Sequence, residues 1–494
     1  MTMPAIGALR KAFPGSKLSL LVKPSVVPLF ERCPDIDDII LYEERFKRIA
    51  GRLQLAQLLR KRRFSRAILL QNAFDAALLS FLAGIPERIG YSRDGRGVLL
   101  TRPVPFHGDD RKVHHIRYYL NLLAEAGITA DYAHPWINIS LEERLAARAA
   151  LAGLRRPVLG LNPGAAYGSA KRWLPERFAE VAGRFCRETK GSVVIFGGKN
   201  EAGIAQEIAG LFSARPGAAQ SGAYENFAGN TSLRELISLI SECDVFVTND
   251  SGPMHIAYAV GAPLVAIFGS TDPELTGPPG EGDVVLRNKP ECSPCFGRTC
   301  RNNDLKCMDG IAPDEVYRGI EKLLPRKRAV FFDRDGTLCR DAHYLNSWKD
   351  FEVFPEIESL REVKDRGFAL FGVTNQSGIQ RGLVDESFVQ EVNRLFMGKY
   401  GFEDFYYCPH GPDEHCSCRK PGPAMLLRAR REHGINLRES YVVGDKDADM
   451  LLAKAVGAKG ILVTTGKQEV SSHADFVVNN LKEVARVILS HGKD

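Results

Sequence analysis

The sequence predicts an α/β fold with parallel sheets and more than one domain. Short apolar runs of strand length alternate with amphipathic helical stretches along the chain, which is the pattern of parallel sheets covered by helices. The chain has 494 residues, too many for a single hydrophobic core, so we expect two or three domains. Polar turns follow several of the apolar runs, and open α/β sheets carry their functional side chains at such strand ends.

We divide the chain into a first unit of residues 1–150, a second of residues 151–324, a basic linker of residues 325–328 and a third unit of residues 329–494. In the first two units, strands are predicted at 17–22, 37–41, 66–70, 157–161, 192–196, 245–248 and 264–268. Helices are predicted at 141–151, leading out of the first unit, and at 313–324, closing the second, where a proline occupies the first turn.

The composition is that of an ordinary globular protein. Charged residues make up 26% and hydrophobic residues 44% of the chain, and the formal net charge is +6. The basic residues are scattered, which permits an anionic ligand or a membrane surface but does not indicate a nucleic-acid partner. No apolar run approaches the roughly 20 residues that span a bilayer, and the N-terminus lacks the pattern of a secretory signal. We therefore expect a cytoplasmic protein with at most peripheral membrane contact.

Seven of the eleven cysteines fall in two groups, and in a reducing compartment they are free thiols or metal ligands rather than disulfides. The first group, with its histidine, consists of Cys408, His410, Cys416 and Cys418. Three thiolates and one imidazole form a tetrahedral zinc set with no open position, which predicts a structural zinc ion. The second group consists of Cys292, Cys295, Cys300 and Cys307. It has two interpretations, a four-thiolate metal site or free structural thiols.

The third unit begins with the most informative motif of the chain. An apolar run, residues 329–332, ends at Asp333 and Asp335 and is broken by Gly336 and Thr337. A carboxylate at such a strand end can attack phosphorus and form an aspartyl-phosphate. A second carboxylate two residues later can protonate the leaving oxygen and then activate water. For this motif taken alone, a surface turn is the alternative interpretation.

Three more strand-and-turn segments supply the other groups that phosphoryl transfer needs. Asp445 follows another predicted strand, and together with Asp333 it would hold Mg²⁺, which prefers oxygen ligands. Thr374 and Lys420 would bind the phosphoryl oxygens as these gain charge. The sequence therefore predicts phosphatase chemistry in the third unit.

These four segments, in this order, resemble the haloacid dehalogenase superfamily of phosphatases over residues 328–490. The cysteine-rich loop, followed at once by Arg-Lys-Pro, is similar to the subgroup of histidinol phosphatases and heptose-bisphosphate phosphatases, in which a zinc loop shapes the substrate pocket. The resemblance implies a HAD-like Rossmannoid domain with Asp333 as nucleophile and Asp335 as general acid/base. It implies Mg²⁺ at Asp333, Asp335 and Asp445, and substrate contacts at Asn375, Gln376, Ser377, Arg381 and Arg419. Asp447 and Asp449 stay open, as partners of the site or as helix N-terminal charges.

Two loops of the second unit are suited to a diphosphate. Residues 162–173 form a glycine-rich loop that contains Lys171 and offers backbone N–H groups and a positive charge. Its spacing is not that of a P-loop. Residues 248–255 run from a strand through a turn into a helix, which Asp250 or Ser251 would cap while other N–H groups stay free for an anion. For Asp250, a plain N-cap is the alternative.

Together these loops resemble the ADP-heptose:lipopolysaccharide heptosyltransferase family over residues 1–324, which implies two facing Rossmann-like domains of the GT-B type. The donor ADP-heptose would meet Lys171, Glu201, Asn249, Asp250, Ser251, Gly252 and His255, without a metal. The family opens with a strand, a glycine loop and an aspartate base. The first strand and the base are missing here, because residues 1–6 resemble the helix after that loop. We expect that the true start lies upstream of Met1, or that this half is a poor transferase.

The two resemblances predict a bifunctional enzyme of lipopolysaccharide-core biosynthesis. Its phosphatase would remove the 7-phosphate of heptose 1,7-bisphosphate with Mg²⁺, and its structural Zn²⁺ would hold the pocket loop. Its transferase would pass heptose to a lipid A-core acceptor at the cytoplasmic face of the inner membrane. Histidinol-phosphate phosphatase activity and a non-catalytic, nucleotide-sugar-binding N-terminal half are the alternatives.

Overall fold

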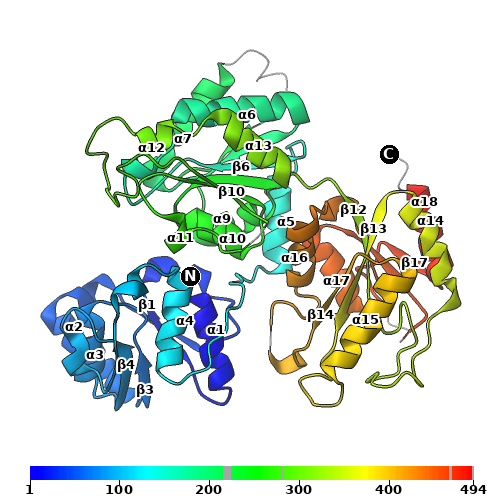
Figure 1. Cartoon of the computed structure of the whole chain (residues 1–494), viewed down its shortest axis with the longest axis horizontal. Coiled ribbons are helices and arrows are strands. Elements are labelled where there is room, and N and C mark those ends of the chain that lie inside the picture. Colours follow the sequence, from blue (N-terminus) through cyan, green and yellow to red (C-terminus); the bar gives the residue numbers. More distant parts are fainter. Residues whose placement is uncertain (215–223, 281, 415, 467–469, 492–494) are drawn as a thin grey trace.

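A computed structural model describes residues 1–214, 224–280, 282–414, 416–466 and 470–491. It contains three α/β bodies in the order of the three predicted units (Figure 1). All strand pairs between described strands are parallel, as the sequence predicts. Among the described residues, each helix is too short or too polar to span a bilayer.

The strands of the first unit form two separate sheets. One pairs β1 with β2, and the other has the order β3-β4-β5. Among the described strands, none pairs with the second edge of β1 or of β3, as expected for a sheet that lacks a strand. The elements are α1 (Met3–Ala12), β1 (Ser19–Val22), β2 (Asp38–Leu41), α2 (Ile49–Lys61), β3 (Arg66–Ile68), α3 (Phe74–Leu82), β4 (Glu87–Tyr91), β5 (Arg102–Val104) and α4 (His115–Glu125).

The second unit has one six-stranded sheet of order β11-β10-β9-β6-β7-β8. Its strands are β6 (Val158–Asn162), β7 (Ser192–Ile195), β8 (Tyr224–Asn226), β9 (Val245–Asn249), β10 (Leu264–Phe268) and β11 (Val284–Arg287). Its helices are α5 (Leu141–Ala150), α6 (Pro175–Thr189), α7 (Ala202–Ser213), α9 (Leu233–Ser241), α10 (Gly252–Ala259), α11 (Pro273–Thr276), α12 (Lys306–Asp309) and α13 (Pro313–Leu323). Buried side chains of α6, α7 and α13 cover one face of the sheet, and those of α5, α9 and α10 cover the other.

The third unit also has a six-stranded sheet, of order β14-β13-β12-β15-β16-β17. Its strands are β12 (Arg328–Phe332), β13 (Phe368–Asn375), β14 (Asp404–Cys408), β15 (Tyr441–Gly444), β16 (Lys459–Val463) and β17 (Phe476–Val478). Its helices are α14 (Leu360–Asp365), α15 (Glu386–Tyr400), α16 (Ala424–His433), α17 (Asp447–Val456) and α18 (Leu481–His491). Because β13, β12 and β15 are neighbours, the polar turns after these strands meet at one edge of the sheet.

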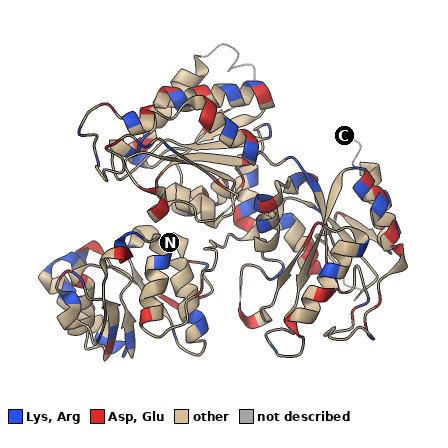
Figure 2. Cartoon of the chain, viewed as in Figure 1, with Lys and Arg blue, Asp and Glu red and all other residues tan. Residues whose placement is uncertain are grey.

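The third unit lies against the second along α5. This helix contacts α9 on one side and α17 on the other. Arg148 donates hydrogen bonds to the carbonyl oxygens of Lys454 and Ala455 at the end of α17, and it pairs with Glu242 after α9 at 3.0 Å. Arg438 of the third unit pairs with the same carboxylate. Figure 2 shows basic and acidic residues gathered where α5 and α16 meet.

Candidate active sites

The third unit holds a buried lysine between two buried carboxylates. The Lys420 Nζ atom lies 2.7 Å from Asp333 Oδ1 and 2.6 Å from Asp449 Oδ1, and it donates a hydrogen bond to the carbonyl oxygen of Val373 at 3.0 Å. Burial alone would lower the pKa of Lys420, but the two carboxylates hold it above its usual value. The ammonium group is therefore charged in the folded protein.

A third acid, Asp445, joins this pair. One carboxylate oxygen from each of Asp333, Asp445 and Asp449 lies within 4.8 Å of the other two. Burial, and then the Asp333 charge, raises the pKa of Asp445 to about 7, and burial raises the pKa of Asp449 to about 6. The negative charges of these carboxylates repel one another. A divalent cation bound between them relieves this repulsion, and Mg²⁺ prefers oxygen ligands, so the three acids fit Mg²⁺. The Asp335 carboxylate lies outside this group, and Asp449 stands in it instead.

Two glycines leave room for the Asp445 carboxylate. Gly336 has a φ of +93°, and a Cβ atom there would lie 2.6 Å from Asp445 Oδ2. A Cβ atom at Gly466 would lie 2.2 Å from the same oxygen. A larger residue at either position would push the carboxylate out of the acid group, so both positions require glycine.

Asp335 is held by two neighbours. Arg334 donates to both of its oxygens, at 3.0 and 3.1 Å, and the Gln376 amide donates to Oδ2 at 2.7 Å. Burial alone would raise the pKa of Asp335, but the Arg334 charge and these hydrogen bonds lower it. The group is therefore a carboxylate, the form that accepts a proton.

The turn after β13 and the loop before α16 lie against each other. The Gln376 amide donates to the Thr374 hydroxyl at 2.9 Å, and Asn375 Oδ1 accepts the backbone N–H of Lys420 at 3.0 Å. Arg419 donates to the carbonyl oxygen of His410 at 3.3 Å. These contacts fix the lysine loop relative to the strand that carries Thr374.

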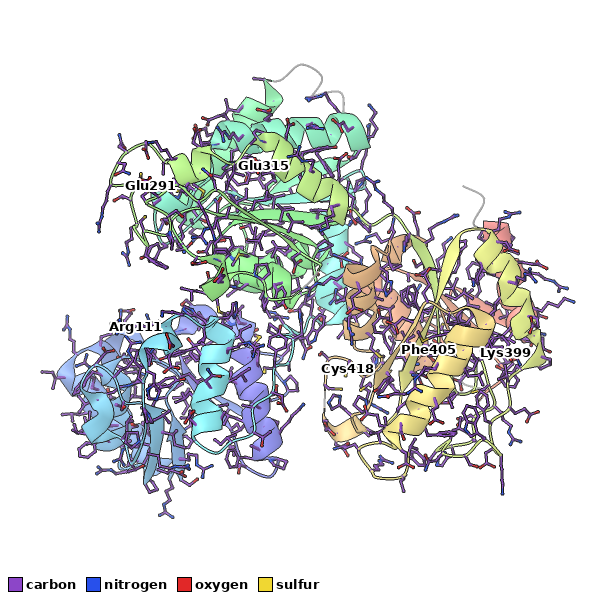
Figure 3. All side chains as sticks on the ribbon, in the orientation of Figure 1. Arg111, Glu291, Glu315, Lys399, Phe405 and Cys418 are labelled. Atoms are coloured by element: carbon purple, nitrogen blue, oxygen red, sulfur yellow. The ribbon has the colours of Figure 1, made fainter. Side chains whose placement is uncertain are left out.

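The predicted zinc set is assembled at the edge of the third unit that faces the other two, where Figure 3 labels Cys418. The ligand atoms of Cys408, His410, Cys416 and Cys418 lie within 4.8 Å of one another. His410 Nδ1 lies 3.2 Å from Cys418 Sγ, and the Cys408 and Cys416 sulfurs lie 3.4 Å apart. All four soft ligands converge on one point, so the set fits Zn²⁺.

In the second unit, the two predicted loops meet because β6 and β9 pair, with Asn162 opposite Thr248. The Lys171 ammonium group forms an ion pair with Asp250 at 2.5 Å, and the Thr271 hydroxyl donates to the same carboxylate oxygen at 2.6 Å. The Asp250 carboxylate is thus tied to side chains of two other loops, and this holds the glycine-rich loop against the turn after β9.

The start of α10 is open to an anion. The Ser251 side chain makes no capping hydrogen bond and instead lies 3.1 Å from the Thr248 hydroxyl. A Cβ atom at Gly252 would meet nothing within 4 Å. Asn249 is buried and fixes the loops, because its amide donates to the Pro163 carbonyl oxygen at 2.7 Å. The N–H groups at this helix end can therefore face a ligand.

A cavity of about 370 Å³ lies between the first and second units and is lined by His114 and His255, among others. Burial lowers the pKa of His255 to about 4, so its imidazole is neutral at neutral pH. His114 also joins the two units, because its Nε2 atom lies 2.9 Å from the Gly277 carbonyl oxygen.

Both the transferase-like part (the first two units) and the third unit of the chain are similar to known proteins. Residues 52–306 match the model of glycosyltransferase family 9 (heptosyltransferase), and residues 417–484 match a HAD-hydrolase-like model. Lipopolysaccharide heptosyltransferase 2 of Escherichia coli (strain K12) is 30% identical over 297 residues, 58% of this chain and 84% of that protein. The D-glycero-beta-D-manno-heptose-1,7-bisphosphate 7-phosphatase of the same organism is 40% identical over 183 residues, 33% of this chain and 95% of that protein.

The chain belongs to both families. It is a fusion of a family 9 heptosyltransferase homologue with a HAD-like heptose-bisphosphate phosphatase homologue. The solved E. coli ADP-heptose lipopolysaccharide heptosyltransferase II has a TM-score of 0.56 and 29% identity, covering 65% of this chain and 94% of that chain. The first two units therefore have the GT-B arrangement of a heptosyltransferase, and the fold class predicted from the sequence is confirmed.

Three further residues predicted from the sequence, Glu201, Ser377 and Arg381, lie in the described part of the structure. In the transferase homologue, Glu201 lies against the glycine-rich loop, where a Cβ atom at Gly164 would come within 2.1 Å of its carboxyl carbon. In the phosphatase homologue, Ser377 is half-buried, and Arg381 is exposed and donates to the Tyr344 hydroxyl.

The second cysteine group is not assembled. Within the part of the chain that the structure describes, Cys292, Cys295, Cys300 and Cys307 do not bring three ligand atoms within 4.8 Å of one another. All four are free thiols, which favours the second of the two interpretations given above.

The sequence did not predict two residues that hold site carboxylates in place, Thr271 beside Asp250 and Arg334 beside Asp335. Thr271 follows β10, and the polar triplet after that apolar strand was the available signal. Arg334 stands between the two acids of the opening motif, and its full burial could not be anticipated because its amide partner, Asn393, lies far along the chain on α15.

Proposed function

We propose that the third unit removes the 7-phosphate of heptose 1,7-bisphosphate and that the first two units transfer heptose from ADP-heptose to a lipid A-core acceptor. The observation that carries the phosphatase half is the contact of Lys420 with Asp333 beside two further buried acids. The 40% identity to a heptose-bisphosphate phosphatase supports the substrate. The 30% identity to a heptosyltransferase supports the donor.

In the proposed hydrolysis, the Asp333 oxygen that does not contact Lys420 attacks phosphorus. The bond from phosphorus to the sugar oxygen breaks, and that oxygen takes a proton that the Asp335 carboxylate has accepted from the monoanionic phosphate group of the bound substrate. Water then attacks the aspartyl-phosphate, gives a proton back to the Asp335 carboxylate and frees phosphate. Thr374 would donate to the phosphoryl oxygens as these gain charge. Lys420, whose three N–H groups contact Asp333, Asp449 and the Val373 carbonyl oxygen, would do so as it gives up its contact with the attacking Asp333. Arg334 and Gln376 hold Asp335 in place between the two steps.

Both metals fit residues of this unit. Asp333, Asp445 and Asp449 would hold Mg²⁺, which supplies positive charge toward the phosphoryl group. Cys408, His410, Cys416 and Cys418 would hold Zn²⁺, which fixes the loop that leads to Arg419 and Lys420. In this proposal Asn375, Gln376, Ser377, Arg381 and Arg419 face the sugar and its second phosphate.

In the transferase half, the open N-terminus of α10 and Lys171 would bind the diphosphate of ADP-heptose. Asn249, Asp250, Ser251, Gly252 and His255 would line the donor, and Glu201 would hold its ribose. The alternative for this half is donor binding without transfer. Transfer to a lipid acceptor would place the protein at the cytoplasmic face of the inner membrane.

A substrate panel tests the phosphatase assignment. Phosphate release from both anomers of heptose 1,7-bisphosphate should exceed release from histidinol phosphate by at least about tenfold in kcat/KM. The reverse order would assign the unit to histidinol phosphate.

A paired binding and transfer assay tests the other half. Calorimetry with ADP-heptose should show binding that is lost in Lys171→Met, and labelled heptose should reach a lipid A-core acceptor. Binding without transfer would support the alternative, and no binding would exclude both.

A further inference from the structure

A cavity of about 530 Å³ lies between the transferase and phosphatase parts of the chain. One wall is formed by the segment that connects the two transferase domains, residues 136–139, and by the start of α5. The opposite wall is formed by residues 416–424 of the phosphatase, with side chains of α16 and α17. Lys420 belongs to this wall and to the phosphatase site, but its ammonium group is occupied by Asp333 and Asp449. The volume is that of a small-molecule site.

Arg144 lines this cavity and also a smaller one that includes Glu242 and Asp244, and it carries a buried charge without a direct hydrogen-bond or ion-pair partner among the described residues. Its exposed fraction is only 4%. Among the hydrogen bonds and ion pairs of the described residues, none involves its guanidinium group, and its Nε atom is buried without a hydrogen bond. The acid that stabilises the Arg144 charge most is Glu242, and its carboxylate is already bound by Arg148 and Arg438. A buried charge in this situation is costly unless an anion completes it.

The remaining lining defines the chemistry of such an anion. Among the described residues that line the cavity, none is an aspartate or glutamate, and Arg419 and Lys420 are cations beside Arg144. Most others are apolar, including Trp136, Ile139 and Leu451. Burial lowers the pKa of Arg144 only to about 10, so it is charged at neutral pH. A ligand with one anionic end and an apolar or aromatic body matches both features.

We propose that this cavity binds a small organic anion whose phosphate-like group pairs with Arg144 and whose apolar body packs against Trp136, Ile139 and Leu451. The ligand would touch the transferase connection and the phosphatase loop at once. The site would therefore be a place where one metabolite contacts both enzymes of the fusion, beside the loop that carries Arg419 and Lys420 into the phosphatase site.

Calorimetry of the full-length protein with phenylphosphonate, which has a non-hydrolysable anionic group on an aromatic ring, tests the proposal. Saturable binding should weaken at least about tenfold in Arg144→Met, since a charge-assisted hydrogen bond is lost. Arg428→Met, at an exposed arginine of α16 that does not line the cavity, should bind like the wild type. Thr374→Val, which removes an uncharged group of the phosphatase site that does not line the cavity, should also bind like the wild type.

A second variant keeps the proposal testable if Arg144→Met does not fold. Asn138 lines the same cavity, and Asn138→Asp adds a negative charge with almost no change of shape, so it should weaken binding several-fold. No saturable binding, equal binding in the wild type and both cavity variants, or loss of binding in Thr374→Val would overturn the proposal.

Discussion

The Nζ atom of Lys420 lies 2.7 Å from Oδ1 of Asp333, and both side chains are almost fully buried. The contact fixes one oxygen of the carboxylate and leaves the other without a contact to Lys420. It depends on the loop that links the cysteine and histidine cluster to α16, because Lys420 is only two residues after Cys418. The order of that loop and the orientation of Asp333 are therefore coupled.

Replacing Lys420 should impair the phosphatase strongly. In Lys420→Met, Asp333 and Asp449 lose their shared cation and the phosphoryl oxygens lose a donor, so we expect kcat to fall by about 10²–10³-fold. Phosphate release under saturating substrate measures this. The matched control is Lys399→Met, an exposed lysine of α15 labelled in Figure 3, which should retain wild-type kcat. A Lys420→Met enzyme within threefold of wild type would contradict the assigned role.

Gly466 should tolerate no side chain. In Gly466→Ala, the Cβ atom would lie 2.2 Å from Asp445 Oδ2 and displace that carboxylate, so we expect the Mg²⁺ concentration for half-maximal activity to rise at least about tenfold. Gly398→Ala is the control, since a Cβ atom there meets nothing within 4 Å. An unchanged Mg²⁺ dependence in Gly466→Ala would show that Asp445 is not a ligand.

Zinc content should depend on one cysteine group and not on the other. The purified chain should contain about one zinc per molecule, and the double variant Cys416→Ser with Cys418→Ser should contain none. Cys292→Ser should keep its zinc, because that cysteine is outside the assembled set. Elemental analysis decides, and zinc lost in Cys292→Ser but kept in the double variant would reverse the assignment.

Glu143 should give the fold a pH-dependent contribution. Burial alone would raise its pKa, but hydrogen bonds from Arg234 and the Ser140 N–H hold it at about 2, below the ordinary 4.5. Its stabilisation, on the order of 1–3 kcal/mol, is therefore complete above pH 4.5 and is lost as the pH falls toward 2. Glu143→Gln should lower the thermal midpoint at pH 7 and less so at pH 4. Glu142→Gln, at an exposed position, should change neither, and a pH-independent difference for Glu143→Gln would refute the ion-pair account.

Short apolar runs were enough to predict most strands of the transferase part, and amphipathic patterns predicted two of its helices. The strand at 264–268 is observed with the predicted bounds, and the helix at 313–324 ends one residue earlier. The strands at Glu87–Tyr91, Arg102–Val104, Tyr224–Asn226 and Val284–Arg287 escaped prediction. The second and third are only three residues long and are mostly polar or interrupted by proline.

The candidate sites were predictable where residues adjoin a strand end and not where the chain returns from afar. Asp333 and Asp445 directly follow apolar strands, so their meeting could be expected. Asp449 lies about one helical turn after Asp445. Its place beside Asp333 is evident only from the folded structure, in which the Lys420 ammonium group contacts both acids. The docking of α5 on α17 had no local signal, since Arg148 and the carbonyl groups that it binds are about 300 residues apart.

Phosphate release from heptose 1,7-bisphosphate by the full-length chain tests the central claim most directly. With Mg²⁺ present, the wild type should release one phosphate per substrate molecule, and Asp333→Asn, which has no nucleophilic carboxylate, should release none above background. No release by the wild type with Mg²⁺, or equal release by Asp333→Asn, would contradict the account.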